Sequence, residues 1–235
     1  MEYRMANWVN GYFTGIDYIS EFYGQYAPSN IEAVRLFQRQ SRITSRPAFR
    51  HFELGCGHGL TSIILAACYP EASFTANDFL PQHVASARAL AKKLGLSNVT
   101  FIEASFDELN QQNYQPFDYI LSHGVYTWVA ENSKQAIREF VAENLASTGV
   151  FSLRYNCKAG WAELDNLVEI FRVFATQHAD HQIEPDHSPT LEKIKALFRK
   201  NRGFFKANGR AAEYLRQLID DEVDPKYLFH ERLTY

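Results

Sequence analysis

From Phe49 onward, short apolar runs alternate with amphipathic stretches along the chain. Short apolar runs are typical of strands buried on both faces, and amphipathic stretches are typical of the helices that cover such a sheet. This alternation predicts α/β architecture, with a Rossmann-like, doubly wound and mostly parallel sheet. The expected strands cover residues 49–54, 72–77, 99–104, 117–122 and 150–155, and the expected helices between them cover 60–68, 81–94 and 133–145.

The stretches on either side of this core have a different pattern. Residues 1–48 are rich in Tyr and Phe and predict a mostly helical N-terminal lid, with Asn30 as the cap of a helix over 31–40. After Gly160 no alternating strand pattern returns, and helices are expected over 161–178, 191–199 and 211–221. We therefore predict a lid of residues 1–48, a ligand-binding domain of residues 49–160, and a helical C-terminal extension of residues 161–235 packed on that domain.

Composition narrows the class of protein. The 235 residues carry a formal net charge of −3, which gives no broad basic field for a nucleic-acid backbone. The longest apolar run, around 63–69, is too short to span a bilayer, and the N-terminus does not resemble a signal peptide. The 3 cysteines, at 56, 68 and 157, have no paired spacing. We expect a cytoplasmic protein with no nucleic-acid partner and no membrane partner.

A glycine turn follows the first predicted strand, in the order Glu53-Leu54-Gly55-Cys56-Gly57-His58-Gly59. Glycines at this position let the backbone approach a ligand at the carboxyl edge of the sheet. Dinucleotide enzymes place the third glycine three residues after the second, where this chain has Leu60, so the spacing disfavours NAD. Asp78 ends the second predicted strand, where a carboxylate can accept hydrogen bonds from both hydroxyls of an adenosine ribose.

A purely structural interpretation of the same residues stays open. The glycines would then only form a strand-helix turn, and Asp78 would cap the helix that begins near Pro81. Cys56 is expected to fill space in the turn rather than to act as a nucleophile.

These residues resemble the class I S-adenosylmethionine-dependent methyltransferases, whose first motif is an acidic residue followed by x-G-x-G-x-G. The resemblance spans roughly residues 49–155 and implies S-adenosylmethionine as the cofactor. It implies that the methionine part lies beside Glu53, Gly55 and Gly57, that Asp78 holds the ribose, and that Phe79 covers the adenine. It also implies that Ser105 and Phe106 line the adenine edge, and that His123 lies beside the methionine part and the acceptor.

Two further segments resemble a bacterial methyltransferase subgroup that includes protein-lysine methyltransferases and often carries a C-terminal regulatory domain. They are residues 123–129 (HGVYTWV) and residues 155–161 (YNCKAGW), where the subgroup has Ser in place of Thr127 and Pro in place of Ala159. The loop containing Tyr26 and the stretch 227–231 are similar to the subgroup as well, which places Tyr26 among the expected cofactor contacts. Subgroup chains usually continue beyond this last stretch.

Methyl transfer requires an aligned acceptor, and an amine acceptor must also lose its proton. The candidate catalytic residues are His123, Tyr126 and Tyr155, at the ends of the fourth and fifth predicted strands. Tyr126 and Trp128 could form an aromatic slot for a cationic or apolar acceptor, although an aromatic cluster at a sheet edge is more often core. The acceptor is expected to be a nucleophilic nitrogen or oxygen, on a protein side chain such as a lysine or on a small molecule, and the sequence leaves a homodimer open.

His178, His181, Glu184 and His187 recur at three-residue intervals, as zinc ligands sometimes do. Prolines interrupt this stretch, so we predict a polar loop and no metal. Two alternatives to an enzyme of the methyltransferase class remain: a non-catalytic relative that serves as a binding or dimerisation module, and a nicotinamide-dependent oxidoreductase, which Leu60 disfavours.

Overall fold

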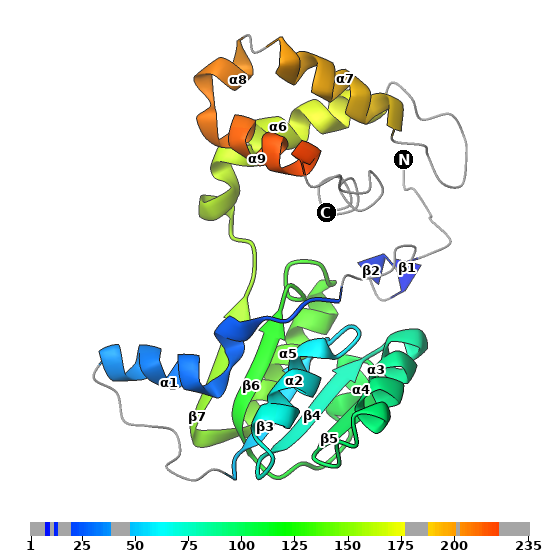
Figure 1. Cartoon of the computed structure of the whole chain (residues 1–235), viewed down its shortest axis with the longest axis vertical. Coiled ribbons are helices and arrows are strands. Elements are labelled where there is room, and N and C mark those ends of the chain that lie inside the picture. The colour runs from blue at the N-terminus through cyan, green and yellow to red at the C-terminus, as the bar shows by residue number, and fades with distance from the viewer. Residues whose placement is uncertain are drawn as a thin grey trace. The chain divides into compact units, whose positions relative to one another are not determined.

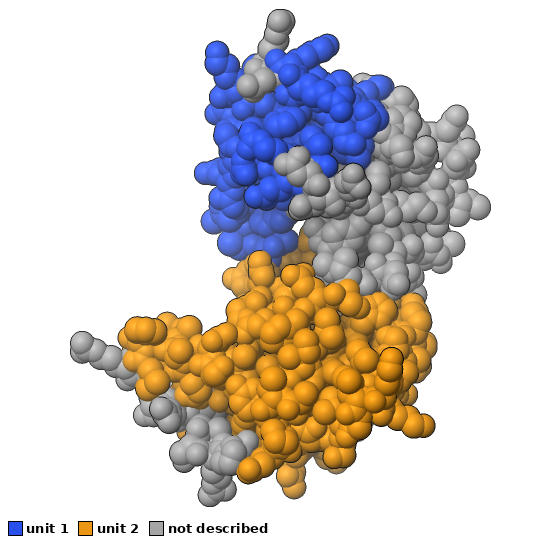
Figure 2. All heavy atoms as spheres, viewed as in Figure 1, with its two compact units in different colours: residues 1–16, 156–235 blue, residues 17–155 orange. Residues whose placement is uncertain are grey.

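The computed structural model describes residues 8–9, 12–13, 20–38, 48–176, 188–200 and 203–220. These residues form two compact units, one built from 17–155 and the other from 1–16 together with 156–235 (Figure 2). The candidate zinc ligands between 178 and 187 and the stretch 227–231 lie outside the described residues, as do the side chains of Tyr12 and Phe13.

The larger unit contains a five-stranded, all-parallel sheet, which confirms the predicted fold class (Figure 1). Its strands lie in the order β5-β4-β3-β6-β7, so the chain adds strands on one side of β3 and then crosses to the other. Such a reversal opens a crevice at the carboxyl ends of the central strands, where open α/β sheets bind their ligands. The bounds are β3 (Arg50–Leu54), β4 (Ser73–Asp78), β5 (Val99–Glu103), β6 (Phe117–His123) and β7 (Leu145–Arg154).

Helices cover both faces of the sheet. On one face, α1 (Pro28–Phe37), α2 (Leu60–Cys68) and α3 (Pro81–Lys93) pack against β3, β4, β5 and β6 through apolar clusters that include Ile31, Leu65 and Phe74. On the other face, α4 (Phe106–Leu109) and α5 (Glu131–Asn144) pack against Phe52 and Ile120. Successive side chains along β3 point to opposite faces of the sheet, so they contact the two helix layers in turn.

A histidine of β3 is buried in this interior without a hydrogen bond to its ring. His51 has no exposed surface, and within the described part of the chain neither of its ring nitrogens has a partner. Its ring lies 5.0 Å from that of Phe74, and burial lowers the pKa of His51 to about 3. At neutral pH this imidazole is therefore uncharged and packs as an aromatic ring.

Most predicted elements agree with the structure to within a few residues, but β7 begins at Leu145 rather than at 150, and the short helices over 106–109 and 204–207 were not predicted. The N-terminal segment differs as well. Residues Trp8–Val9 (β1) and Tyr12–Phe13 (β2) form a short antiparallel ladder in a stretch expected to be mostly helical. Helix α1 begins at Pro28 with Ala27 as its N-cap, so the prediction of Asn30 as the cap is wrong. The reason is that Pro28 suits the first helical position, while the Asn30 side chain donates to the Gly24 carbonyl at 2.7 Å.

In the second unit, the described residues after 156 are helical, as expected, and have their own apolar core. This unit contains α6 (Lys158–Thr176), α7 (Ser188–Arg199), α8 (Phe204–Ala207) and α9 (Gly209–Asp220). Leu167, Phe171, Ile194 and Leu215 are buried among these helices. None of the described helices is long and apolar enough to cross a bilayer.

Candidate functional site

The glycine turn joins β3 to α2 and is tied to the neighbouring strand. The Cys56 amide donates to the Asn77 carbonyl at 2.8 Å, and the Gly55 amide donates to the Asn77 side-chain oxygen at 3.3 Å. The Asn77 amide group in turn donates to the Ala104 carbonyl at 3.0 Å. The turn is therefore held in place from β4 and from the end of β5.

Gly55 and Gly59 are required for packing as well as for the backbone conformation. Both have φ near +70°, where a side chain is strained. A Cβ on Gly55 would lie 2.5 Å from Val125 Cγ2, and a Cβ on Gly59 would lie 2.4 Å from Phe101 Cε1. The sequence predicted that Gly55 lets the backbone approach a ligand, whereas a side chain of the protein itself already occupies the place of its Cβ, as also happens at Gly59.

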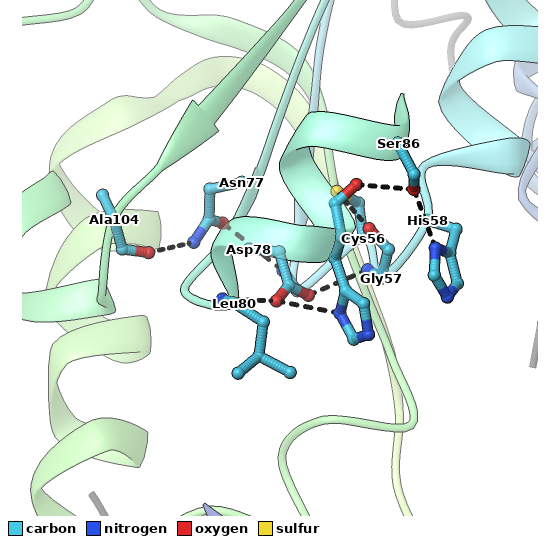
Figure 3. A network of polar contacts seen from close by, with 10 residues as sticks. Cys56, Gly57, His58, Asn77, Asp78, Leu80, Ser86 and Ala104 are labelled. Atoms are coloured by element: carbon cyan, nitrogen blue, oxygen red, sulfur yellow. Dashed lines mark hydrogen bonds and ion pairs between the residues drawn. The ribbon is translucent and has the colours of Figure 1, made fainter. Parts of the chain in front are cut away.

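Asp78 lies at the end of β4 and bridges the turn to the start of α3 (Figure 3). Its Oδ2 accepts a hydrogen bond from the Gly57 amide at 2.9 Å. Its Oδ1 accepts from the Leu80 amide at 3.0 Å and contacts His83 Nδ1 at 3.2 Å. The carboxylate is thus at the predicted edge. The N-cap of α3 is Leu80, with no side-chain capping bond, so the purely structural expectation that Asp78 caps this helix is wrong: Asp78 bonds to the amide of the N-cap residue.

The side chain of Glu53 lies beneath the same turn and is only 5% exposed. The Ser62 hydroxyl, from the first turn of α2, donates to Glu53 Oε2. Burial raises the pKa of Glu53 to about 7, against the lowering effect of the Ser62 hydrogen bonds. A carboxyl poised near neutrality ionises readily when a positive charge is placed beside it.

A pocket opens beside the turn and is lined by residues from three segments. The lining residues are Ser20, Glu21, Tyr23, Glu53, Gly55, Cys56, His58, Gly59, Leu60, Thr61 and His123. The segment before α1 is fastened here because the Tyr23 amide donates to the Thr61 hydroxyl at 3.1 Å. Among the described residues that line this pocket there are two carboxylates and no lysine or arginine.

His123, at the end of β6, forms one wall of the pocket. Its ring lies 3.7 Å from the ring of Tyr23 and 5.2 Å from that of Tyr26, measured between centroids. Arg154 Nη1 lies 3.3 Å from His123 Nε2. Burial, and secondarily Arg154, lowers the pKa of His123 to about 4, while burial raises the pKa of Tyr26 to about 12. Both side chains are therefore uncharged at neutral pH.

The other two candidate catalytic residues lie together, outside the pocket lining. The Tyr126 and Tyr155 rings are 6.3 Å apart, and Tyr155 is 54% exposed. The Tyr126 hydroxyl accepts a hydrogen bond from Arg138 Nη1 at 2.6 Å, and Lys134 Nζ lies 5.9 Å from the ring centroid. Tyr126 is therefore anchored to α5.

The residues expected at the adenine edge follow β4 and β5. Phe79, Ser105 and Phe106 are all partly exposed. The Ser105 hydroxyl is the N-cap of α4 and accepts from the Glu108 amide at 3.3 Å, while Glu108 reaches back to the Ser105 amide at 2.8 Å. This reciprocal pair is the capping box that the spacing Ser-x-x-Glu encodes, a signal in the sequence that the prediction missed.

Several residues of the site were not anticipated. Glu21 and Thr61 line the pocket, and His58 bonds to the Ser86 hydroxyl through its Nδ1 at 2.8 Å. His83, in the first turns of α3, is buried against Asp78. No local pattern marks these residues, because each reaches the site through the packing of its own element.

The sheet is parallel and doubly wound, and a glycine turn lies beside the acidic residues Glu53 on β3 and Asp78 on β4. These features define a nucleoside-binding α/β protein. A family model described as a methyltransferase domain matches residues 46–226. The chain therefore belongs to this methyltransferase family, which confirms the class inferred from the glycine turn. S-adenosylmethionine is the cofactor of that class, as predicted.

Three similar proteins illustrate this relationship. An uncharacterized protein of Synechocystis sp. is 36% identical over 224 residues, which cover 95% of this chain and 44% of that protein. The structure of PKMT2 from Rickettsia typhi in complex with AdoHcy has a TM-score of 0.73 and 19% identity, covering 92% of this chain and 41% of that one. A ribosomal RNA small subunit methyltransferase G of Bacteroides thetaiotaomicron is 36% identical over 83 residues, covering 35% of this chain and 38% of that protein. The chain thus spans less than half the length of each of these relatives.

Proposed function

We propose that this chain binds S-adenosylmethionine in the pocket beside the glycine turn and transfers its methyl group to an amine, with a protein lysine as the acceptor. The observation that carries the proposal is the charge of the pocket, where Glu21 and Glu53 face the ligand space and the described lining has no lysine or arginine. Such a lining suits a sulfonium or an ammonium cation, and it offers no cationic side chain for the pyrophosphate of a dinucleotide.

The cofactor fits the residues at the turn. Glu53 lies beneath it, half-ionised at neutral pH, and a neighbouring positive charge would complete its ionisation. The turn precedes the N-terminus of α2, whose free amide groups favour a carboxylate such as that of the methionine part. Asp78 carries its carboxylate at the end of β4, the strand next to β3, and this is where a contact with the ribose is expected.

When bound, S-adenosylmethionine supplies an electrophilic methyl group on a positively charged sulfur. The chain's own contribution is to position the acceptor and to exclude water from it. Tyr23, Tyr26 and His123 form an aromatic wall beside the pocket, and such rings can face a cationic or neutral amine.

His123 is better suited to positioning than to proton removal. A guanidinium only donates hydrogen bonds, so the contact with Arg154 makes Nε2 of His123 the acceptor and leaves the proton on Nδ1. With a pKa of about 4, the ring is a weak base. The amine is then expected to react in its deprotonated form, so the rate of transfer rises with pH as the amine loses its proton to water.

The test has two stages, both on the full chain. Calorimetric titration with S-adenosylhomocysteine is expected to give saturable binding that Glu53→Gln weakens, and absence of binding by the wild type would refute the proposal. Purified protein with isotope-labelled S-adenosylmethionine is then incubated with a cell lysate, and peptide mass spectrometry is expected to find label on lysine side chains. Label only on RNA would reject the amine acceptor, and binding without any transfer would favour a non-catalytic module.

A further inference from the structure

The carboxylate of Asp78 is already engaged by the protein, and unequally on its two oxygens. An ionised carboxylate has about four positions at which it accepts hydrogen bonds, two on each oxygen. Among the residues that the structure describes, Oδ2 accepts from the Gly57 amide alone, whereas Oδ1 has both the Leu80 amide and His83 Nδ1 within hydrogen-bond distance. Asp78 is 7% exposed and His83 is 3% exposed, so water does not compete freely for these positions.

The direction of the His83 contact follows from the chemistry of the pair. A carboxylate only accepts, so the 3.2 Å contact requires a proton on Nδ1 of His83. The Leu80 donor is a backbone amide two residues after Asp78, fixed by the start of α3. Among the described residues, His83 is therefore the one side chain that fills Oδ1, and changing it leaves both backbone donors to Asp78 in place.

The histidine is itself fixed in place by α3 and by the glycine turn. Its backbone carbonyl accepts from the Ser86 hydroxyl at 2.9 Å, and that hydroxyl bonds to His58 at 2.8 Å. The rings of His58 and His83 lie 4.5 Å apart. Figure 3 shows the resulting chain of contacts from His58 through Ser86 to the carboxylate between Gly57 and Leu80.

We propose that His83 sets how the site recognises the cofactor's ribose: by occupying Oδ1 it limits Asp78 to a single ribose hydroxyl, which donates to Oδ2. The inference rests on the proposed function, because it takes Asp78 as the ribose contact. It replaces the expectation that Asp78 accepts from both hydroxyls. A side chain at position 83 that cannot donate would open Oδ1 to the second hydroxyl.

The experiment compares three ligands on the full chain by calorimetry: S-adenosylhomocysteine, its 2′-deoxy form and its 3′-deoxy form. For each protein the measured quantity is the deoxy penalty, the ratio of the Kd of a deoxy form to that of the parent ligand. Because a hydrogen bond to a charged group contributes about 1.5–3 kcal/mol, loss of one hydroxyl that donates to Asp78 is expected to weaken binding roughly 10- to 100-fold.

In His83→Leu one of the two deoxy penalties is expected to grow by about tenfold, while the other stays as in the wild type. His83→Asn keeps a donor near the place of Nδ1, so both its 2′-deoxy and its 3′-deoxy penalty are expected to equal those of the wild type. A structural role alone would weaken all three ligands equally and leave both penalties unchanged in His83→Leu, and that result would overturn the inference.

A matched control comes from the same helix. Arg88 also lies on α3, and its guanidinium donates to the Phe101 carbonyl at 2.7 and 3.1 Å rather than to Asp78. Arg88→Leu should disturb the docking of α3 without changing either deoxy penalty. If the wild type fails to bind S-adenosylhomocysteine, the proposed function fails and not only the role of His83. If the wild type binds but Asp78→Ala binds all three ligands equally well, Asp78 is not the ribose contact, and the inference on His83 fails while cofactor binding stands.

Discussion

Two regions at the carboxyl edge of the sheet are built in different ways. The turn edge, residues 53–59 and 77–83, is bonded through the backbone, with the Asp78 carboxylate accepting from the Gly57 and Leu80 amides. The aromatic edge, residues 123–129 and 154–155, has a backbone bond from the Gly124 amide to the Arg154 carbonyl at 3.3 Å, but its aromatic rings are held by contacts between side chains, such as Arg138 with Tyr126 and Arg154 with His123. The turn edge depends on the path of the chain, whereas single substitutions can change the positions of these rings. Under the proposed function, a change at the aromatic edge alters the acceptor side and leaves the cofactor turn in place.

The largest effect is expected where the two edges touch, at Gly55 and Val125. Gly55→Ala places a Cβ at φ +70° and within 2.5 Å of Val125 Cγ2. Backbone strain of about 1 kcal/mol and overpacking of about 1–3 kcal/mol should add, lowering the free energy of unfolding in urea by about 2–4 kcal/mol. Gly95→Ala is the matched control, because Gly95 has φ +69° and its Cβ would meet no atom within 4 Å. Equal losses in the two variants would show that the contact with Val125 is unimportant.

The next effect concerns the buried carboxyl of the turn edge. The pKa of Glu53 rises from 4.5 to about 7 in the folded protein. The protonated Glu53 carboxyl therefore makes its full contribution to stability below pH 4.5. As the pH rises through 7, this contribution is lost and the free energy of unfolding falls by about 3 kcal/mol in total. Without ligand, Glu53→Gln should be more stable than the wild type at pH 8 and should lose this advantage towards pH 5. Urea unfolding at a series of pH values measures the difference, and a difference independent of pH would contradict the shifted pKa.

At the aromatic edge a smaller, electrostatic effect is expected. Arg154→Gln removes the second cause of the low pKa of His123 and leaves burial, which is the first. The pKa should rise from about 4 but remain below 6.5, as followed by NMR titration of the imidazole protons. A value that stays at 4 would show that Arg154 has no influence on the ring.

The smallest effect is expected at the outer end of the same edge. Arg138→Gln removes the donor to the Tyr126 hydroxyl, but Arg138 is exposed and the pair is screened by water. The urea midpoint should be indistinguishable from that of the wild type, while the KM for the acceptor changes if Tyr126 contributes to the acceptor slot. A clear loss of stability would mean that the aromatic edge is as rigid as the turn edge.

The sequence predicted the turn edge far better than the aromatic edge, for a physical reason. Strand periodicity and glycine spacing are local, so β3, the turn and α2 were placed almost residue by residue. The partners of His123 and Asp78 are not local in this sense. Arg154 reaches His123 only because β6 and β7 pair in register, and His83 reaches Asp78 only because α3 begins at Pro81 in that phase.

Two other misses have the same origin in competing local signals. Asn30 looked like a helix cap, yet the fixed backbone angle of Pro28 starts α1 earlier. His51 occupies an inward position of β3, where an apolar residue is usual, and no sequence motif indicates a neutral buried imidazole. Burial and helix phase are properties of the packed molecule, so they appear only with the structure.

The contact between Gly55 and Val125 also has a consequence for protein engineering. Because β3 lies between β4 and β6, the loops that follow β6 and β7 can be exchanged without altering the strand that carries the turn. Under the proposed function, grafts in the loop after β6 that aim at another acceptor should keep Tyr126 and Val129, which pack against the core, and a side chain no larger than valine at position 125. Val125 sets the clearance between that loop and the glycine turn.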